Sequence, residues 1–472
     1  MKHIALTLGS IIETLSLGRK TAEIWAASYL FSSFMKGIID ELRKKDVSFI
    51  IPYVEDDTVF QTQDNGIGLF HDRFILTTET VTLSEIAAIV QKHKDNLSEM
   101  IAASIKEDTD KVKSYIDQYL QTYLIELNQK FENPILEISE ILDNVELHVP
   151  YIETDKDYLR IFLNRDIILN SKMAKNALGS KPSFKSIPEI AAQAMPVVES
   201  LDDEAYYKTL EKDKEHFKQA YKYIAIVHAD GDSLGSYIKQ QTDPGVVSRR
   251  LFSFDTEAAK KITGYGGLPI FIGGDDLLFF APVLTKDETI FDLIDNLSAL
   301  YKKEMQSDET TLSFGLSITY YKYPLYEALE QSRNALYNYA KKYPDANNPT
   351  KNAVHISARK HSGQVFEATV CKADKSYQLF RTLLNDVLVD GLELPHSIHH
   401  KLEGYKKLFL TIPDERIEAT FDNLFNEEIH QEKFEKGLKD IRNLMTALGR
   451  DEQNFTRLFA LLSIVKLLRS DR

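Results

Sequence analysis

Hydrophobic and polar positions alternate in blocks along residues 216–342, and these blocks predict a sheet domain. Four apolar runs are typical of strands: 221–229, 268–272, 277–283 and 312–322. Three stretches have helical spacing: 246–262, 289–305 and 325–342. The first six of these elements follow the order strand, helix, strand, strand, helix, strand. That order is typical of a ferredoxin-like domain.

The beginning of the chain predicts a looser copy of this order, without a residue-level repeat. Strands are expected at 2–9, 47–54 and 72–81, and a helix over 21–45. Residues 82–145 read as almost wholly helical, and so do the last hundred residues. We therefore expect an α+β protein with two ferredoxin-like domains plus helical domains. The predicted domains are 1–140, 141–215, 216–360 and 361–472.

Two acidic segments of the second predicted domain carry candidate chemistry. HADGDSLG at 228–235 puts Asp230 and Asp232 at the end of a buried strand, and FIGGDDLLFF at 271–280 puts Asp275 and Asp276 at a hairpin tip. The first strand of a ferredoxin-like sheet lies beside this hairpin, so we expect the two acidic turns to face each other. Either motif alone is typical of a polar turn, but four converging carboxylates would repel one another without a cation.

Carboxylate oxygens are the ligands that Mg²⁺ prefers, usually together with substrate phosphates and waters. Two such ions, Mg²⁺ or Mn²⁺, suit an in-line phosphoryl displacement. The predicted metal ligands are Asp230, Asp275 and Asp276. Glycines let a ligand approach the backbone closely, and four of them belong to the two motifs: Gly231, Gly235, Gly273 and Gly274. We expect a nucleotide to lie over the Gly273–Gly274 turn.

These segments resemble the second Palm domain of the large GGDD subunit of type III CRISPR effector complexes. The run GRKTAEIWAASYLFS at 18–32, the segment GLFHDRFIL at 68–76 and the strand and helix over 312–341 resemble the Cmr-type branch. The resemblance covers about residues 1–365. It implies an enzyme that, on target RNA binding, polymerises ATP into cyclic oligoadenylates or couples AMP to S-adenosylmethionine. It also implies partner subunits, a guide RNA and a target RNA.

The resemblance also assigns further residues. Asp232 and Ser233 would border the triphosphate, and Lys341 would reach a phosphate as a point charge. Arg19 and Ser28 are the candidates for binding a second nucleotide on the first Palm domain. Trp25 has helical neighbours and is expected in the core.

Two departures from the family change what is expected. Many members begin with an HD nuclease domain, whereas this sequence begins at a Palm strand. His71–Asp72 precedes a strand and is expected on a surface or in a loop, so no HD-type nuclease activity is predicted. Many members also hold zinc through cysteines, and the single cysteine, Cys371, predicts no such zinc site.

The charge and the apolar runs limit partners and location. The net charge is −14, so the chain lacks the basic field of a free-standing nucleic-acid binder. RNA would then be met through local patches or partner subunits. No run of eighteen apolar residues and no signal peptide is seen, which predicts a cytoplasmic protein without a membrane span.

Two alternatives remain open from the sequence. A GGDEF-like dinucleotide cyclase would use similar metal chemistry, but here Leu277 and Leu278 follow the acidic pair instead of Glu and Phe. A catalytically inactive scaffold subunit is the other alternative, and it would be expected to have lost an acidic residue. We also expect target RNA to act by shifting the two Palm domains relative to each other.

Overall fold

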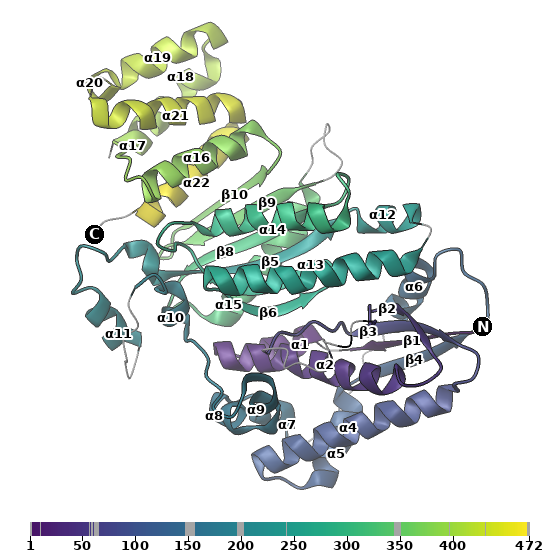
Figure 1. Cartoon of the computed structure of the whole chain (residues 1–472). Coiled ribbons are helices and arrows are strands. Elements are labelled where there is room, and N and C mark those ends of the chain that lie inside the picture. Colours follow the sequence, from purple (N-terminus) through teal and green to yellow (C-terminus); the bar gives the residue numbers. More distant parts are fainter. Residues whose placement is uncertain are drawn as a thin grey trace.

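The computed structural model contains two antiparallel-rich sheets, each covered by helices, and a bundle of helices at the C-terminus (Figure 1). The structure describes residues 2–9, 11–55, 57, 60, 66–146, 156–195, 203–241, 243–343, 351–395, 397–429 and 431–469. Within these residues, none of the helices combines the length and the apolar character that crossing a bilayer requires.

The first sheet domain has the strand order β2-β3-β1-β4, the ferredoxin-like arrangement. Its elements are β1 (Lys2–Leu8), α1 (Ile11–Leu17), α2 (Thr21–Leu42), β2 (Ser48–Ile51), β3 (Arg73–Thr78), α4 (Leu83–Ile105), α5 (Thr109–Tyr119) and β4 (Thr122–Leu127). The expectation of an almost wholly helical 82–145 is therefore wrong at β4. The segment TYLIEL is rich in β-branched and aromatic residues and pairs with β1, which supplies hydrogen bonds that the local pattern does not reveal.

The second sheet domain has the strand order β10-β9-β8-β5-β7-β6, which extends the same arrangement by two strands. Its elements are β5 (Tyr223–Asp232), α12 (Leu234–Gln240), α13 (Pro244–Tyr265), β6 (Leu268–Gly273), β7 (Asp276–Pro282), α14 (Ile290–Met305), β8 (Thr311–Tyr320), α15 (Leu325–Asn334), a π-helical turn (Ala335–Tyr339), a 3₁₀ turn (Ala340–Lys342), β9 (Ala353–Arg359) and β10 (Val365–Cys371). The predicted domain limit at 360 cuts through the β9–β10 hairpin, and the limit at 140 cuts through α6.

The remaining regular elements of the described chain are helical. In the sequence between the two sheet domains come α6 (Pro134–Glu146), α7 (Tyr158–Phe162), α8 (Arg165–Asn170), α9 (Lys172–Leu178), α10 (Ile187–Ala191), α11 (Asp203–Leu210) and a 3₁₀ turn (Gln219–Lys222). The C-terminal bundle contains α16 (Lys375–Leu388), α17 (Ile398–Gly404), α18 (Lys406–Thr411), a 3₁₀ turn (Asp414–Arg416), α19 (Ile417–Leu424), α20 (Asn426–Ile429), α21 (Glu432–Leu448) and α22 (Glu452–Arg469), in agreement with the predicted helical end.

Strand β5 is buried on both faces, and its alternating side chains enter two different cores. Ala225 and Val227 belong to the cluster that includes α13, α14 and the C-terminal helices. Ile224 and Ile226 belong to the cluster that includes Trp25 and the other buried residues of α2. Successive residues of a strand point to opposite faces, so β5 joins the two cores. The acidic end of β5 is thereby fixed between the two sheet domains.

Candidate active site

The two acidic segments meet because β5 and β7 are neighbouring antiparallel strands. Ala229 of β5 pairs with Leu277 of β7, so Asp230 and the turn before Asp276 lie at the same end of the sheet. A Cβ atom added to Gly231 would lie 2.7 Å from Oδ2 of Asp275, which shows how closely the turn packs on β5. The sheet therefore brings Asp230, Asp275 and Asp276 together, as the ferredoxin-like order predicts.

The GGDD turn is held by backbone geometry and by one buried carboxylate. Gly274 has φ +70°, in the left-handed region where glycine is favoured. Its amide donates a hydrogen bond to Oδ2 of Asp255 over 2.9 Å. Asp255 lies on α13 and is 1% exposed. Sequence reasoning missed Asp255, because nothing in its local pattern distinguishes it from an ordinary helix residue.

The acidic residues of the turn share an environment that disfavours charge in the absence of a cation. Burial, reinforced by the charge of Asp230, raises the pKa of Asp275 to about 7. Burial and the neighbouring Asp275 and Asp230 raise the pKa of Asp276 well above its ordinary value. Burial also raises the pKa of Asp230, although Lys341 acts in the opposite direction. Such a cluster is stabilised by added positive charge.

Lys341 supplies positive charge to this cluster. Its Nζ lies 2.8 Å from Oδ1 of Asp230 and 3.2 Å from Oδ1 of Asp232, and it also donates to the carbonyl oxygen of Gly231. Burial lowers the pKa of Lys341, but the carboxylates of Asp232 and Asp230 outweigh this effect and raise it. The expected phosphate-binding lysine is therefore a counter-ion of the acidic cluster in this conformation.

Asp232 has a different position from the one expected. It is fully buried, and its Oδ2 accepts hydrogen bonds from the hydroxyls of Thr311 and Ser313 and from the amide of Asn352. These bonds tie β5, β8 and the start of β9 together. With no exposed surface, Asp232 does not border open space for a triphosphate, and it acts here as a structural acceptor.

The donor set fits a hard divalent cation, with a condition. In the described part of the chain, no group of three or more His, Cys, Asp or Glu side chains is already arranged as a metal cage. Mg²⁺ sites in nucleotide enzymes typically need only one or two carboxylates, because phosphates and waters complete the shell. Asp230 and the GGDD carboxylates would hold the ions once the ammonium of Lys341 leaves Asp230.

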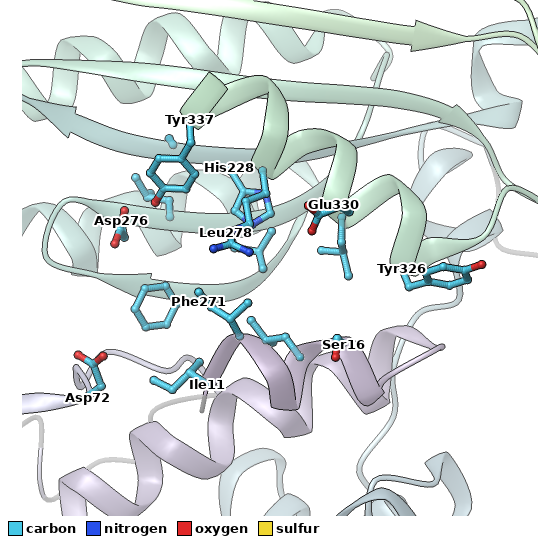
Figure 2. Close-up of a pocket in the computed structure, with 16 residues that line it drawn as sticks. Ile11, Ser16, Asp72, His228, Phe271, Asp276, Leu278, Tyr326, Glu330 and Tyr337 are labelled. Carbon is cyan, nitrogen blue, oxygen red and sulfur yellow. The ribbon is translucent and has the colours of Figure 1, made fainter. Parts of the chain in front are cut away.

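A cavity of about 460 Å³ opens beside the acidic cluster, between the two sheet domains. Helix α1 forms one wall through Ile11, Ile12, Leu15 and Ser16, and α15 with the π-helical turn forms the opposite wall through Tyr326, Leu329, Glu330, Arg333 and Tyr337. Asp276 and Asp72 lie at one end and Tyr326 at the other (Figure 2). The lining is mostly apolar with a few polar groups, as in many small-molecule sites.

The remaining candidates are spread more widely. Arg19 is exposed, and its guanidinium lies 5.2 Å from the ring centre of Tyr326 at the end of the cavity. Ser28 is 2% exposed on α2 and does not line the cavity. Ser233 has φ +60° at the junction of β5 and α12, and Gly235 is exposed on α12. Trp25, at 2% exposure, is a core residue as predicted.

The dipeptide His71–Asp72 was expected on a surface or in a loop. It lies in a loop, but it is only partly exposed and lies at the acidic cluster. The His71 ring packs against the glycines of the GGDD turn, and burial, together with Arg73, lowers the pKa of His71 to about 4. About 200 residues separate the loop from the turn, so no local sequence signal indicates this contact.

Comparisons with known proteins agree with the observed fold. Residues 223–354 match the family described as Cas10/Cmr2, second palm domain, and residues 3–114 match the family described as CRISPR-associated protein Cmr2, N-terminal. The CRISPR system Cmr subunit Cmr2 of Pyrococcus furiosus is 28% identical over 195 residues, covering 35% of this chain and 21% of that protein. The match therefore spans about a fifth of the relative's length.

Solved structures of low identity share the fold along nearly the whole chain. A type III-B Cmr-beta structure in the apo state matches with TM-score 0.63 and 10% identity, covering 98% of this chain and 81% of the other. A Cmr-beta structure bound to cognate target RNA matches with TM-score 0.63 and 12% identity, covering 99% of this chain and 83% of the other. A Csm1–Csm4 cassette in complex with AMPPNP matches with TM-score 0.57 and 12% identity, covering 99% of this chain and 70% of the other.

Each of the two sheet domains thus matches a region of Cas10/Cmr2 proteins. The N-terminal match covers the first sheet domain up to residue 114 in α5, before β4, and the palm match covers the strands that carry Asp230 and the GGDD turn. The chain therefore belongs to the Cas10/Cmr2 family of palm-domain subunits, in its Cmr-type branch.

Proposed function

We propose that this chain is the nucleotide-polymerising subunit of a type III CRISPR effector complex and joins ATP-derived units at the GGDD turn. A hydroxyl of an acceptor attacks the α-phosphorus of ATP, the new P–O bond forms, and pyrophosphate leaves. With ATP as acceptor, repeated transfers give a linear oligoadenylate with a 5′-triphosphate, and the ring closes when its terminal hydroxyl attacks its own α-phosphorus and a further pyrophosphate leaves. With S-adenosylmethionine as acceptor, the product is a conjugate with AMP.

The single observation that carries this proposal is the packing of the GGDD turn against the acidic end of β5. It places Asp275 and Asp276 beside Asp230 at the end of a cavity large enough for a nucleoside. Divalent ions, when bound, neutralise the triphosphate and lower the pKa of the attacking hydroxyl. The chain's own carboxylates hold these ions, and the apolar walls around Leu278 and Leu329 exclude water from the base.

The polar groups of the cavity orient the substrate. Arg333 and Glu330 line the α15 wall and can distinguish acceptor groups by charge. His228 also lines the cavity; burial, together with Arg333, lowers its pKa to about 3, so its imidazole is neutral. The ring is held by a 2.8 Å hydrogen bond between Nδ1 and the hydroxyl of Ser332, and its other nitrogen remains for a hydrogen bond to a base or sugar.

Assembly with partner subunits, a guide RNA and a target RNA belongs to the same proposal. The net charge of −14 supports it, because an acidic chain meets RNA more readily through basic partners. Solved assemblies of the same fold include one bound to cognate target RNA. Target RNA would then control the arrangement of the two palm domains around the cavity.

Product analysis by mass spectrometry tests the proposal. The reconstituted complex, with guide and target RNA, receives ATP and Mg²⁺ or Mn²⁺, with or without S-adenosylmethionine, and in a parallel reaction it also receives GTP. We expect adenylate products that disappear in an Asp275→Ala/Asp276→Ala variant. An Asp308→Ala/Glu309→Ala variant removes two adjacent exposed carboxylates elsewhere and should retain activity. Absence of product under all conditions would favour a scaffold, and guanylate products would favour a GGDEF-like cyclase.

A further inference from the structure

The two glycines of the GGDD turn are required for different reasons. Gly274 adopts the left-handed conformation, whereas Gly273 does not have a positive φ. A Cβ atom on Gly273 would instead lie 3.1 Å from both Nδ1 and Cε1 of His71, and one on Gly274 would lie 2.6 Å from Cε1. The space over the turn, where a nucleotide was expected, is therefore filled by the imidazole of the first palm domain.

The loop that carries His71 is firmly attached to the first palm domain. The indole Nε1 of Trp25 donates to the carbonyl oxygen of Gly66 over 2.6 Å, and the amide of Phe70 donates to the hydroxyl of Ser32 over 2.9 Å. Both Trp25 and Ser32 lie on α2. At its end, Arg73 pairs with Asp143 and Glu146 of α6. The loop is thus anchored by two helices outside the catalytic domain.

The same loop also bonds directly to the catalytic hairpin. The amide of Ile272, two residues before Gly274, donates to the carbonyl oxygen of Gly68 over 3.4 Å. On the other side, Asp255 accepts the hydrogen bond from Gly274. The turn is consequently held by contacts with the first palm domain on one side and with α13 of the second palm domain on the other.

We propose that His71 is a positioning residue for the catalytic turn. Contact with its ring fixes the position of the Gly273–Gly274 backbone relative to β5. The carboxylates of Asp275 and Asp276 are thereby oriented toward the metal positions beside Asp230. The first palm domain thereby shares in shaping the metal site, and a displacement of α2 would be transmitted to the turn. This inference rests on the proposed function.

The test measures divalent-ion binding, which requires no turnover. Mn²⁺ affinity of the full-length chain is determined by electron paramagnetic resonance in the presence of AMPPNP. His71→Ala should weaken Mn²⁺ binding about 10-fold, the effect typical of residues that orient metal ligands. His71→Phe keeps a ring of similar shape and should restore most of the affinity. Thermal melts identify any variant that fails to fold.

His93 offers a matched control within the same domain. The ring of His93 packs on Gly37 in the same way, since a Cβ atom on Gly37 would lie 2.8 Å from Cε1 of His93. His93, however, lies on α4 and not in the loop that contacts the GGDD turn. His93→Ala should leave Mn²⁺ affinity unchanged. Equal losses in His71→Ala and His93→Ala, or no loss in His71→Ala, would overturn the inference.

A compensating pair of substitutions probes the contact itself. Gly273→Ala should weaken Mn²⁺ binding because the new methyl group meets both His71 and the ring of Phe271. His71→Ala added to it should recover the part of the affinity that the contact with His71 costs. A double variant weaker than both single variants would contradict the contact. A wild-type chain that binds no Mn²⁺ with AMPPNP would instead overturn the proposed function, on which the inference depends.

Discussion

At the scale of single residues, the acidic cluster and Lys341 form one electrostatic unit. The ammonium lies between Asp230 and Asp232, and Lys341 is only 11% exposed in its side chain. The proposed function assigns two roles to this one residue. The ammonium stabilises the cluster without metal, and it would become available to a phosphate if a cation replaced it at Asp230.

Replacing Lys341 separates these two functions. In Lys341→Met, Mn²⁺ has no competing ammonium at Asp230, so the affinity of the full chain for Mn²⁺ alone should increase. The upper limit is about 1.5–3 kcal/mol, or about 10- to 160-fold, the contribution of a hydrogen bond between charged groups. Affinity for ATP in the presence of Mn²⁺ should fall. Both are measurable by isothermal titration calorimetry.

Lys342 gives the control for this substitution, because it bonds only to the exposed Asn338 side chain among the contacts seen. Lys342→Met should change neither affinity. Unchanged Mn²⁺ binding in Lys341→Met would mean that the lysine does not compete with the metal.

The sequence predicts the cluster's membership better than its surroundings. Asp230, Asp275 and Asp276 follow from two short motifs and one sheet order. His71 and Asp255 do not, because their contacts with the turn join distant segments. Asp232 lies two residues from Asp230 on the same face of β5, but it is fully buried and bonded to Thr311 and Ser313. These partners are distant in the sequence, so the motif cannot distinguish a ligand from a buried acceptor.

At the scale of elements, the sequence pattern does not predict the strands β4, β9 and β10. Strand β4 pairs with β1 and β9 pairs in parallel with β8, both far away in the sequence, whereas β10 pairs with the adjacent β9. Local spacing predicts helices well when one face is apolar over many turns, as in α4 and α15. A short strand at the side of a sheet depends on its neighbours, so the sequence around it carries little signal.

The β9–β10 hairpin contains a buried histidine with a testable pH dependence. His355 is 3% exposed, and its Nδ1 lies 2.8 Å from the hydroxyl of Thr369. Burial lowers the pKa of His355 to about 4, whereas the unfolded chain takes up this proton near pH 6.5. Stability is thus retained above pH 6.5 and lost as the pH falls toward 4, by about 3 kcal/mol at 1.36 kcal/mol per pH unit.

His355→Asn should therefore reduce the loss of stability between pH 6.5 and 4.5 relative to the wild-type chain. Urea denaturation at several pH values measures the difference. His400→Asn, at an exposed histidine on α17, serves as the control and should leave the slope with pH unchanged. An identical pH dependence in His355→Asn and the wild-type chain would contradict the expected burial effect.

At the scale of the whole molecule, one of the two large hydrophobic cores contains residues of both palm domains. Phe280 and Leu278 of β7 belong to the same buried cluster as Ile24 and Trp25 of α2. Closely packed cores transmit small displacements and resist large ones. The proposed regulation by target RNA would therefore act through small shifts along the α2–turn contact, within an intact interface.

The shared core predicts that both sheets lose stability together. Phe280→Ala removes a fully buried ring and should cost about 3–5 kcal/mol. Hydrogen exchange should then accelerate in β1 as well as in β5. Phe421→Ala removes an equally buried ring from the C-terminal bundle and should spare β1. Faster exchange confined to the second sheet in Phe280→Ala would show that the domains unfold independently.

The most direct measurement of the central claim is the location of bound Mn²⁺ by anomalous diffraction from crystals of the full chain with AMPPNP. The account predicts Mn²⁺ ligated by Asp230 and the GGDD carboxylates, the base in the cavity beside Leu278, and the ammonium of Lys341 withdrawn from Asp230. Mn²⁺ and nucleotide bound elsewhere, with Lys341 still between Asp230 and Asp232, would contradict it.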